Sequence, residues 1–583
     1  MAASNDEVAR LLAELATLTE IDEGDPNAFR VRAYQNAERA VRSFDGQVSE
    51  LSADELAEVR GIGKSIAGRI REYVDDGRID KLEELRVKHP SGKRDLMKVP
   101  GLGPKSVQQL HEQLDITDLE GLADALADGR IADLPGMGEK TVANIEQAIE
   151  QLGLTSKDQR VPIATALPVA ERIVAALQEV DGVEDVAYAG SLRRFREDIG
   201  DVDVLVASAE AAPAREAFLA LDEVERTIGS GETKTSVVTR DGVQVDLRVV
   251  PPESFGAALL YFTGSKAHNI RLRQRAIDRG WTLNEYALAQ TDEGTEAPVV
   301  ASADEEGIYA ALELPWITPE LREDDGEIEA ATGDGLPSRL TVEDLRGDLH
   351  DHTDLSGDGR DTLEDLVAAA ADRGLAYLAI TDHAEDLRIN GVSQEAMEQQ
   401  RGRIRELEQE RGDIALLHGA ELNIGVDGTL DYDERFLATF DWLVASVHSH
   451  FGRPVEEQTA RVVAAVRHPS VTAIGHLTGR KLGVRPGIEL DLEQVLTAAA
   501  ETGTAIEINA ALARLDAPVT VIREGIRRGC TFVISTDAHA VGELDRARFG
   551  VAQARRAGLD ASAIANTRHL DDFQRWLSDV RSG

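Results

Sequence analysis

The spacing of hydrophobic residues divides the chain into three regions. Between residues 5 and 153, apolar positions recur three and four residues apart and short glycine-containing turns separate them, which predicts helices and no strand. From Glu184 onward the pattern alternates, which predicts strands at 186–189, 202–207 and 243–250. The stretch 321–348 is acidic and rich in glycine, as interdomain linkers are. We therefore expect an all-α region, an α+β region and a further region after the linker.

In the last region, strand-like and helix-like segments alternate regularly. Apolar segments predict seven strands, at 347–350, 375–381, 414–422, 442–448, 471–476, 504–509 and 531–536. Amphipathic segments predict helices at 362–373, 394–411, 456–467, 492–502 and 519–528. This alternation is typical of a parallel, barrel-like (β/α)7 domain, in which functional side chains gather at the C-terminal ends of the strands.

Length and composition fit a multidomain protein. A chain of 583 residues with 42% hydrophobic and 29% charged residues exceeds a single small fold and can bury several cores. No apolar run reaches the ~18 residues of a membrane-spanning helix, and the first residues lack a signal-peptide layout, so we expect a cytoplasmic protein with no membrane partner. The single cysteine, Cys530, excludes an internal disulfide, so any metal would be held by His, Asp and Glu.

The net charge of −43 is unusual for a protein that would approach a polyanion. Acid on every face would exclude nucleic acid, whereas adaptation to high internal salt would make the chain acidic whatever it binds. Only 11 of the 63 basic residues are lysines, which favours salt adaptation. Because the Debye length falls to about 3 Å in molar salt, local motifs must decide the partner.

A glycine motif recurs three times in the helical region. Each copy has the form of a helix–hairpin–helix, in which glycines let the backbone present N–H groups to a phosphate, with a lysine nearby. A single copy could be an ordinary turn between helices, but three copies favour contact with the DNA backbone. The predicted contacts are Gly61, Gly63, Lys64, Gly101, Gly103, Lys105, Gly136, Gly138 and Lys140.

Three aspartates of the α+β region predict a magnesium site. Asp201 and Asp203 are two residues apart on a predicted strand, so their carboxylates point to one face, and Asp246 lies on another, otherwise apolar strand. A turn at Gly190 and Ser191 offers backbone N–H groups to a phosphate, which Arg194 could neutralise. The alternative is a hairpin with surface acids, but surface acids need no apolar flanks.

Histidines and acids gather at the strand ends of the last region, where 10 of the 13 histidines lie. Imidazoles and carboxylates bind zinc, manganese or iron, and clustered divalent ions can activate water beside a phosphate. We assign His418, His450, His468 and His569 to packing or to the surface. The predicted ligands are His350, His352, Asp358, His383, Glu421, His448, His476, Asp537 and His539.

The last 240 or so residues resemble the polymerase-and-histidinol-phosphatase (PHP) domain. Its signatures correspond here to His350–Thr353, Thr381–His383, His418–Glu421 and Asp537–His539. The resemblance implies three ions of Mn²⁺ or Zn²⁺. The first would be held by His350, His352, Glu421 and Asp537, the second by Glu421, His448 and His476, and the third by Asp358, His383 and His539. Asp358 stands where other members have histidine, and this harder ligand leans toward manganese.

The α+β region resembles a nucleotidyltransferase palm, and the segment from Tyr261 to Asn269 resembles the nucleotide-selecting segment of family X DNA polymerases. The resemblance implies Mg²⁺ on the three aspartates and deoxynucleoside triphosphates as substrates. Triphosphate contacts would come from Arg160, Gly190, Ser191 and Arg194. Contacts to the sugar, the base and the template side would come from Tyr261, Phe262, Gly264, Asn269 and Arg273. Taken alone, Tyr261 and Phe262 could simply be core residues.

The resemblance extends over the whole chain, from about residue 5 to 580, and matches the bacterial and archaeal type of family X polymerase. It assigns an 8 kDa-like domain, helix–hairpin–helix fingers, the palm with its nucleotide-selecting subdomain, a linker and the PHP domain to residues 1–85, 86–155, 156–320, 321–340 and 341–583. The small lyase domain of the family uses a Schiff-base lysine, but Arg69 stands at that position and Ser65 at a supporting lysine. An arginine stays protonated and cannot form the imine, which leaves Lys64 as one possible substitute.

The resemblance implies a monomeric DNA-directed DNA polymerase that fills short gaps in repair, with a metal-dependent 3′–5′ exonuclease or 3′-end-processing phosphoesterase in the PHP domain. Its partners would be gapped or primed double-stranded DNA. One alternative is a template-free nucleotidyltransferase fused to a small-molecule phosphatase. The other is a DNA-binding scaffold with decayed sites, although no residue of the matched motifs is missing.

Overall fold

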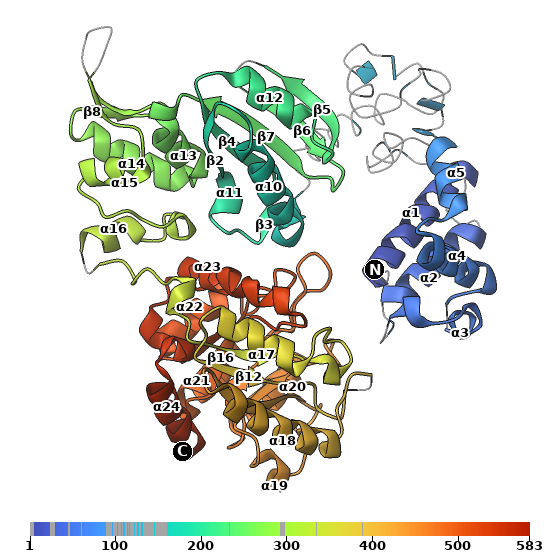
Figure 1. Cartoon of the computed structure of the whole chain (residues 1–583). Coiled ribbons are helices and arrows are strands. Elements are labelled where there is room, and N and C mark those ends of the chain that lie inside the picture. Colours follow the sequence, from blue (N-terminus) through green and yellow to red (C-terminus); the bar gives the residue numbers. More distant parts are fainter. Residues whose placement is uncertain are drawn as a thin grey trace. The chain divides into compact units, whose positions relative to one another are not determined.

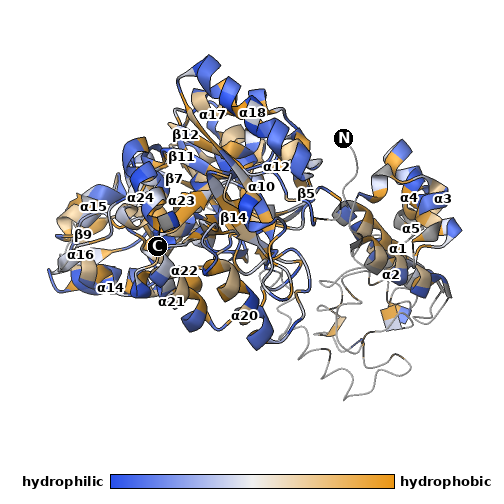
Figure 2. Cartoon of the chain, turned by 90° about the horizontal axis from the view of Figure 1, so that it is seen from below, coloured by the Kyte–Doolittle hydropathy of each residue, from blue (hydrophilic) through white to orange (hydrophobic). Residues whose placement is uncertain are grey.

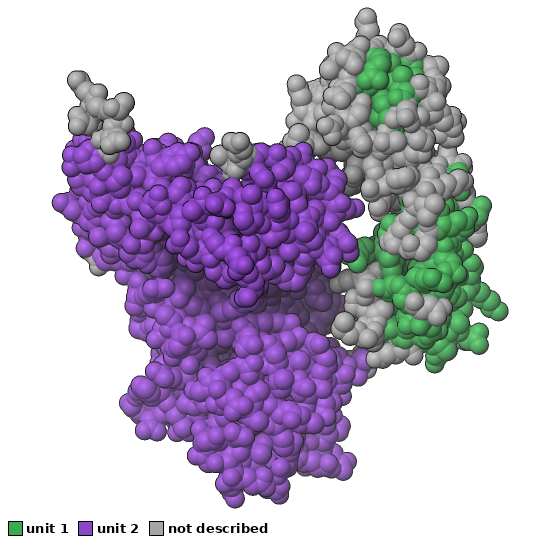
Figure 3. Space-filling model, turned by 45° about the horizontal axis from the view of Figure 1, so that its top comes forward, with its two compact units in different colours: residues 1–158 green, residues 159–583 purple. Residues whose placement is uncertain are grey.

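A computed structural model describes most of the chain. It covers residues 5–23, 29–42, 44, 47–59 and 61–88, single residues or pairs between 96 and 145, and 160–582 without 232–233, 292–297, 334 and 388. The chain divides into two compact units, residues 1–158 and 159–583 (Figure 3). No helix among the described residues is both long and apolar enough to cross a bilayer.

The first unit is helical, as predicted, and its described part contains no strand. Its helices are α1 (Asn5–Glu23), α2 (Phe29–Arg42), α3 (Ala53–Glu58), α4 (Lys64–Asp76) and α5 (Asp80–Lys88). They bury leucines of α1 such as Leu12 and Leu15 in a common core. The first glycine motif joins α3 to α4: Gly61 has φ +106°, and Lys64 is the exposed first residue of α4. The glycines and lysines predicted at 101–105 and 136–140 lie outside the described residues.

The second unit begins with a five-stranded sheet in the order β2–β4–β7–β6–β5. These strands are β2 (Val183–Tyr188), β4 (Val202–Ser208), β7 (Gln244–Val250), β6 (Thr235–Thr239) and β5 (Val224–Ser230). On one face, Val202, Val204 and Val206 of β4 pack with residues of α10 (Ile163–Gln178) and α12 (Ala211–Leu219). Successive strand residues point to opposite faces, so Asp203 and Leu205 face the other side, where Leu205 meets α13 (Phe255–Thr263).

A smaller antiparallel sheet follows, in the order β10–β9–β8. Its strands are β8 (Trp281–Leu283), β9 (Leu288–Gln290) and β10 (Val299–Ala301), and helices α13, α14 (Lys266–Ile277) and α15 (Glu305–Ala311) accompany them (Figure 1). The pattern analysis missed this sheet and the β5–β6 hairpin, because their short strands are largely exposed or polar. Part of the segment expected to be a linker is folded: Arg322 is fully buried, and α16 spans Glu327–Thr332.

The last region is a parallel barrel of seven strands in sequence order, as predicted. The strands are β11 (Gly347–Asp351), β12 (Tyr377–Ile380), β13 (Ala415–Asn423), β14 (Trp442–Ser446), β15 (Ala473–Ile474), β16 (Ala505–Asn509) and β17 (Phe532–Ser535). A bridge between Asp351 and Ala538 brings the first and last strands together, which nearly closes the barrel.

Helices surround the strands of the barrel. They are α17 (Leu363–Asp372), α18 (Gln394–Arg411), α19 (Glu434–Leu437), α20 (Val455–Val466), α21 (Leu492–Thr502), α22 (Val519–Arg528), α23 (Ala547–Ala557) and α24 (Leu570–Ser582). The outer helix α18 is mainly hydrophilic in Figure 2, because only one side of it packs on the strands.

The barrel and the five-stranded sheet belong to the same compact unit and share an interface. Phe549 of α23 stacks on Phe195, with ring centroids 6.2 Å apart. Ala510 and Leu515 of the barrel lie in the same apolar cluster as the residues of α10. Ion pairs cross the interface between Arg480 and Glu197 at 2.8 Å and between Arg548 and Glu171 at 2.6 Å. Apolar packing and charge pairing therefore fix the two parts against each other.

Candidate active sites

Three aspartates meet at the end of the parallel pair β4–β7. Asp203 and Asp246 are direct partners in the register of these strands, so their side chains leave the same face, and Asp201 lies two residues before Asp203. Burial raises the pKa of Asp203 to about 7, and the neighbouring charges of Asp201 and Asp246 add to the rise. The arrangement concentrates negative charge that a divalent cation would relieve.

Neighbouring cations and donors already compensate Asp246. Although burial opposes the change, hydrogen bonds from Lys234, Ser236 and Gln244 lower its pKa. The Nζ atom of Lys234 lies 2.5 Å from Oδ2 of Asp246, and Nε2 of Gln244 donates to Oδ1 at 3.0 Å. Motif reading missed Lys234 and Gln244. Gln244 lies two residues before Asp246 on the same strand, a spacing that could have revealed it.

The predicted glycine turn lies beside the aspartates. Gly190 has φ +65° and begins the short helix α11 (Gly190–Arg193), which also contains Ser191. A Cβ atom on Gly190 would come within 3.1 Å of Oδ2 of Asp203. The residue before the turn, Ala189, donates its N–H to the carbonyl of Asp203 at 2.8 Å. The turn and Asp203 are therefore in contact.

The two arginines predicted to hold a triphosphate have other partners in the structure. The Nε atom of Arg194 lies 3.1 Å from Oε1 of Glu323, and its Nη1 donates to the carbonyl of Thr263 at 2.5 Å. Arg160 is half exposed and pairs with Asp198 at 2.5 Å. Neither arginine is paired with the three aspartates, because Arg194 is paired with Glu323 and Arg160 with Asp198.

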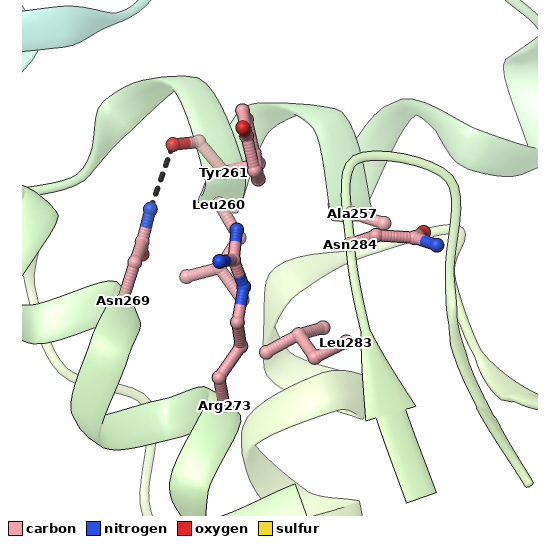
Figure 4. Close-up of a pocket in the computed structure, with 7 residues that line it drawn as sticks. All are labelled: Ala257, Leu260, Tyr261, Asn269, Arg273, Leu283 and Asn284. Carbon is pink, nitrogen blue, oxygen red and sulfur yellow. Dashed lines mark hydrogen bonds between the residues drawn. The ribbon is translucent and has the colours of Figure 1, made fainter. Parts of the chain in front are cut away.

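A small pocket is lined by Tyr261 and Asn269 of the predicted nucleotide-selecting segment and by Arg273 (Figure 4). Nδ2 of Asn269 donates to the carbonyl of Tyr261 at 2.8 Å, and the Arg273 guanidinium lies 5.5 Å from the Tyr261 ring centroid. Phe262 does not line this pocket and instead lies under Arg248 at 4.3 Å. The full lining is Ala257, Leu260, Tyr261, Asn269, Arg273, Leu283 and Asn284, of which motif reading missed Ala257, Leu260, Leu283 and Asn284.

A turn within this segment lies beside Arg194. Gly264 has φ +67°, and a Cβ atom there would meet Nη1 of Arg194 at 3.3 Å. A glycine is needed at this position because the backbone conformation and the close guanidinium both disfavour a side chain. The turn at Gly264 thereby joins the predicted sugar-binding and phosphate-binding segments.

The strand ends of the barrel bring all nine predicted ligands together. Three groups have ligand atoms close enough to share an ion: His350, His352 and Asp537; His352, Asp358, His383 and His539; and His383, Glu421 and His448. Glu421 lies at the centre, with its Oε1 atom 2.8 Å from Nε2 of His476 and 3.1 Å from Nε2 of His448. These groups overlap the three predicted ion sets but differ from them in membership. His352 and His383 each belong to two groups, Glu421 is absent from the group that contains His350, and His476 belongs to none of the three.

Unpaired ring nitrogens show that this cluster fits metal ions. The Nε2 atoms of His350 and His352 are buried and have no hydrogen-bond partner, although both lie within 4 Å of Glu421 and Asp537. Buried unsatisfied nitrogens are costly unless a ligand binds them, and imidazoles facing carboxylates are a donor set for divalent ions. By contrast, His418 stacks on Phe440 at 4.6 Å and belongs to none of the three groups.

Further residues orient two histidines of this cluster. Oε1 of Glu507 lies 2.6 Å from Nδ1 of His350, and Oδ1 of Asn423 lies 2.7 Å from Nδ1 of His448. These bonds leave Nε2 of each ring for an ion. Motif reading missed both residues. Glu507 alternates with buried apolar residues on β16, and an acid at such a position is a detectable signal.

Comparison with known proteins identifies four family domains along the chain. Residues 3–79 match a helix-hairpin-helix domain, 93–150 a SAM-like helix-hairpin-helix tandem, 258–323 the DNA polymerase beta thumb and 348–511 the PHP domain. Fold and sites together define a nucleotidyltransferase of the family X polymerase class joined to a metal-binding PHP domain.

Relatives narrow the class to one family. The chain is 36% identical over 574 residues to the DNA polymerase/3′-5′ exonuclease PolX of Bacillus subtilis, covering 98% of this chain and 99% of that protein. It is 27% identical over 325 residues to rat DNA polymerase lambda, covering 51% of this chain and 52% of that protein. A probable phosphatase of Thermoanaerobacter matches at 27% identity over 236 residues, covering 38% of this chain and 89% of that protein. The chain belongs to the PolX family of DNA polymerases with a PHP domain.

Proposed function

We propose that this protein is a DNA-directed DNA polymerase that fills short gaps during repair and trims 3′ ends with a separate PHP exonuclease. The pairing of Asp203 with Asp246 on adjacent parallel strands is the observation that carries the synthetic activity. Family membership supports the proposal, since the Bacillus relative is named a polymerase and a 3′-5′ exonuclease.

For synthesis, the chain's own residues hold and orient the reactants. Asp201, Asp203 and Asp246 would hold two Mg²⁺ ions, which supply charge neutralisation for a triphosphate and acidify a primer 3′-hydroxyl. The N–H groups at Gly190 and Ser191 lie beside Asp203, so they would bind the phosphates of a deoxynucleoside triphosphate. Removing the charge of Asp203 should therefore end synthesis.

For hydrolysis, the histidines and acids of the barrel would hold three ions, of Mn²⁺ or Zn²⁺. These ions supply an activated water and a clamp for a phosphodiester. Glu421 contacts His448 and His476 and would hold metal ions together with them, while Glu507 keeps His350 oriented. The site lies at the strand ends of a different domain, so the two chemistries are separable.

The glycine motif at Gly61 and Gly63 favours backbone contact with gapped or primed DNA, because exposed N–H groups at the start of a helix bind phosphate whatever the base sequence. Phosphate contact through backbone amides also persists in high salt, and the net charge of −43 supports a protein adapted to a salt-rich cytoplasm. We propose that it acts there as a monomer.

The test is primer extension and degradation on a one-nucleotide gap, with Mg²⁺ or Mn²⁺ and near-molar salt. Asp203→Ala should abolish extension and preserve degradation, and His350→Ala with His352→Ala should do the opposite. Equal incorporation on single strands and on the gap would favour a template-free transferase. Hydrolysis of small phosphate esters without attack on DNA 3′ ends would favour a metabolite phosphatase.

A further inference from the structure

The loop between β16 and α22 brings an arginine to the barrel's metal cluster. The Nε atom of Arg514 lies 3.6 Å from Oδ2 of Asp537, and Asn509 donates to the same oxygen at 3.0 Å. The Arg514 side chain is 19% exposed, and within the described part of the chain its guanidinium makes no hydrogen bond. The guanidinium therefore interacts electrostatically with the acids of the cluster, and its hydrogen-bond donors stay available.

The same loop is fastened to the polymerase domain. Arg480 donates through Nε to the carbonyl of Arg514 at 2.9 Å and through Nη2 to the carbonyl of Leu515. Its two terminal nitrogens also bind both carboxylate oxygens of Glu197 at 2.9 and 2.8 Å. Leu515 itself belongs to the apolar cluster of the polymerase sheet. The position of Arg514 therefore depends on a residue more than 300 positions earlier in the sequence.

We propose that Arg514 binds the phosphate of the DNA 3′ end at the PHP site, and that Glu197 of the polymerase domain positions it through Arg480. The proposal rests on the phosphoesterase activity proposed above. In the proposed metal-bound site the ions would neutralise Asp358, Glu421 and Asp537, and a permanently charged planar donor beside Asp537 would add directional hydrogen bonds to the phosphate oxygens.

A purely structural role for Arg514 fits the geometry less well. An arginine that serves to neutralise a carboxylate usually makes two parallel hydrogen bonds of about 2.8 Å, as Arg480 does with Glu197. Arg514 makes none with Asp537, whose Oδ2 is already bonded to Asn509. Burial and the nearby charge of Arg514 both lower the pKa of Arg485, so the two guanidinium groups are close enough to interact. Arg485 already donates through Nε and Nη2 to the carbonyl of Gly479, whereas the donors of Arg514 are available, so Arg514 is the guanidinium placed to bind an anionic ligand.

The first test compares Arg514→Gln and Arg514→Lys with the native chain. Loss of one phosphate donor should lower exonuclease kcat/KM on a single-stranded oligonucleotide by about 100-fold, with lysine recovering part of it, because lysine keeps the charge but not the fork. Gap filling should stay unchanged. Calorimetric titration of metal-free protein with thymidine 5′-monophosphate should show at least fivefold weaker binding for the glutamine variant. Unchanged exonuclease and unchanged binding would overturn the role of Arg514.

The second test asks whether Glu197 positions Arg514 or only helps to hold the two domains together. Glu197→Gln should lower exonuclease kcat/KM by about tenfold, and combined with Arg514→Gln it should add no further loss, since the glutamate acts only through the arginine. The matched control is Glu171→Gln, which weakens the pair with Arg548 in the same interface but does not touch the loop. Equal losses in Glu171→Gln and Glu197→Gln, or additive losses in the double variant, would overturn the positioning role.

The variant with both His350→Ala and His352→Ala distinguishes a failure of the proposed function from a failure of the role assigned to Arg514. If it keeps its exonuclease, the activity does not belong to the PHP cluster and the proposed function fails. If it loses the exonuclease while Arg514→Gln keeps it, only the assignment of Arg514 fails.

Discussion

Glu305 offers the sharpest test of how the polymerase domain holds its sites together. This carboxylate is 4% exposed and binds two arginines at once. Its oxygens accept from Arg193 at 2.8 and 2.9 Å and from the fully buried Arg322 at 2.6 and 2.9 Å. Trp316 donates to it as well, at 3.1 Å. Arg193 ends the helix of the Gly190 turn, so Glu305 connects that turn to α15 and the segment around Arg322.

We expect Glu305→Gln to lower the free energy of unfolding of this domain by about 3–5 kcal/mol. Glutamine keeps the shape of the side chain but leaves the buried Arg322 charge without a partner, and its amide N–H groups would face guanidinium N–H groups. The assay is urea unfolding followed by tryptophan fluorescence, in which Trp316 reports directly on the network. Gap filling should fall as well, because Arg193 loses its anchor.

The matched control is Glu313→Gln, which removes an ion pair with Arg279 in which Glu313 is 77% exposed. Exposed pairs contribute about 0–1 kcal/mol, so this variant should unfold almost as the native chain does. If Glu305→Gln costs no more than Glu313→Gln, the reasoning from burial and bidentate pairing is wrong.

The pH dependence of the stability loss tests the same prediction. Burial alone would raise the pKa of Glu305, but Arg322 and Arg193 hold it well below its usual range. A carboxyl whose folded pKa is lowered stabilises the fold above its unfolded pKa of about 4.5 and loses that contribution as the pH falls toward the folded value. The stability difference between the native chain and Glu305→Gln should therefore be constant at neutral pH and shrink below about pH 4.5. A difference that grew in acid would contradict this account.

Two further predictions concern the individual sites. Gly190→Ala should slow gap filling with little effect on the exonuclease, because the new Cβ would stand 3.1 Å from Asp203 Oδ2 at φ +65°, where a side chain costs about 1–2 kcal/mol. Steady-state kinetics of both activities would test this prediction, and equal slowing of both would contradict it. Glu507→Gln should weaken metal activation of the exonuclease by about 10–100-fold, because the bond to His350 Nδ1 loses its charge. Activity measured against Mn²⁺ concentration would show this, and an unchanged half-saturation would refute it.

Much of the fold was readable from local patterns. The seven barrel strands alternate with helices and follow sequence order, so each strand and its metal ligands could be placed from its own segment. The glycine turn at Gly190 and the Asp201–Asp203 pair are likewise local. The β5–β6 hairpin and the sheet β8–β10 were not predicted, since strands such as Val224–Ser230 are largely exposed and show no clear apolar alternation. The acidic segment around Arg322 was expected to be a linker, because its composition does not reveal that Arg322 is buried and bonded to Glu305.

The sequence by itself determined which residues are the candidates for the chemistry, because metal ligation and phosphate binding need particular side chains at spacings set within single strands and turns. Only the tertiary structure decided their partners. Lys234 at Asp246, Glu507 at His350 and the path from Glu197 through Arg480 to Arg514 all join residues from different elements. Such contacts depend on how strands register and domains dock, which is a property of packing rather than of any one segment.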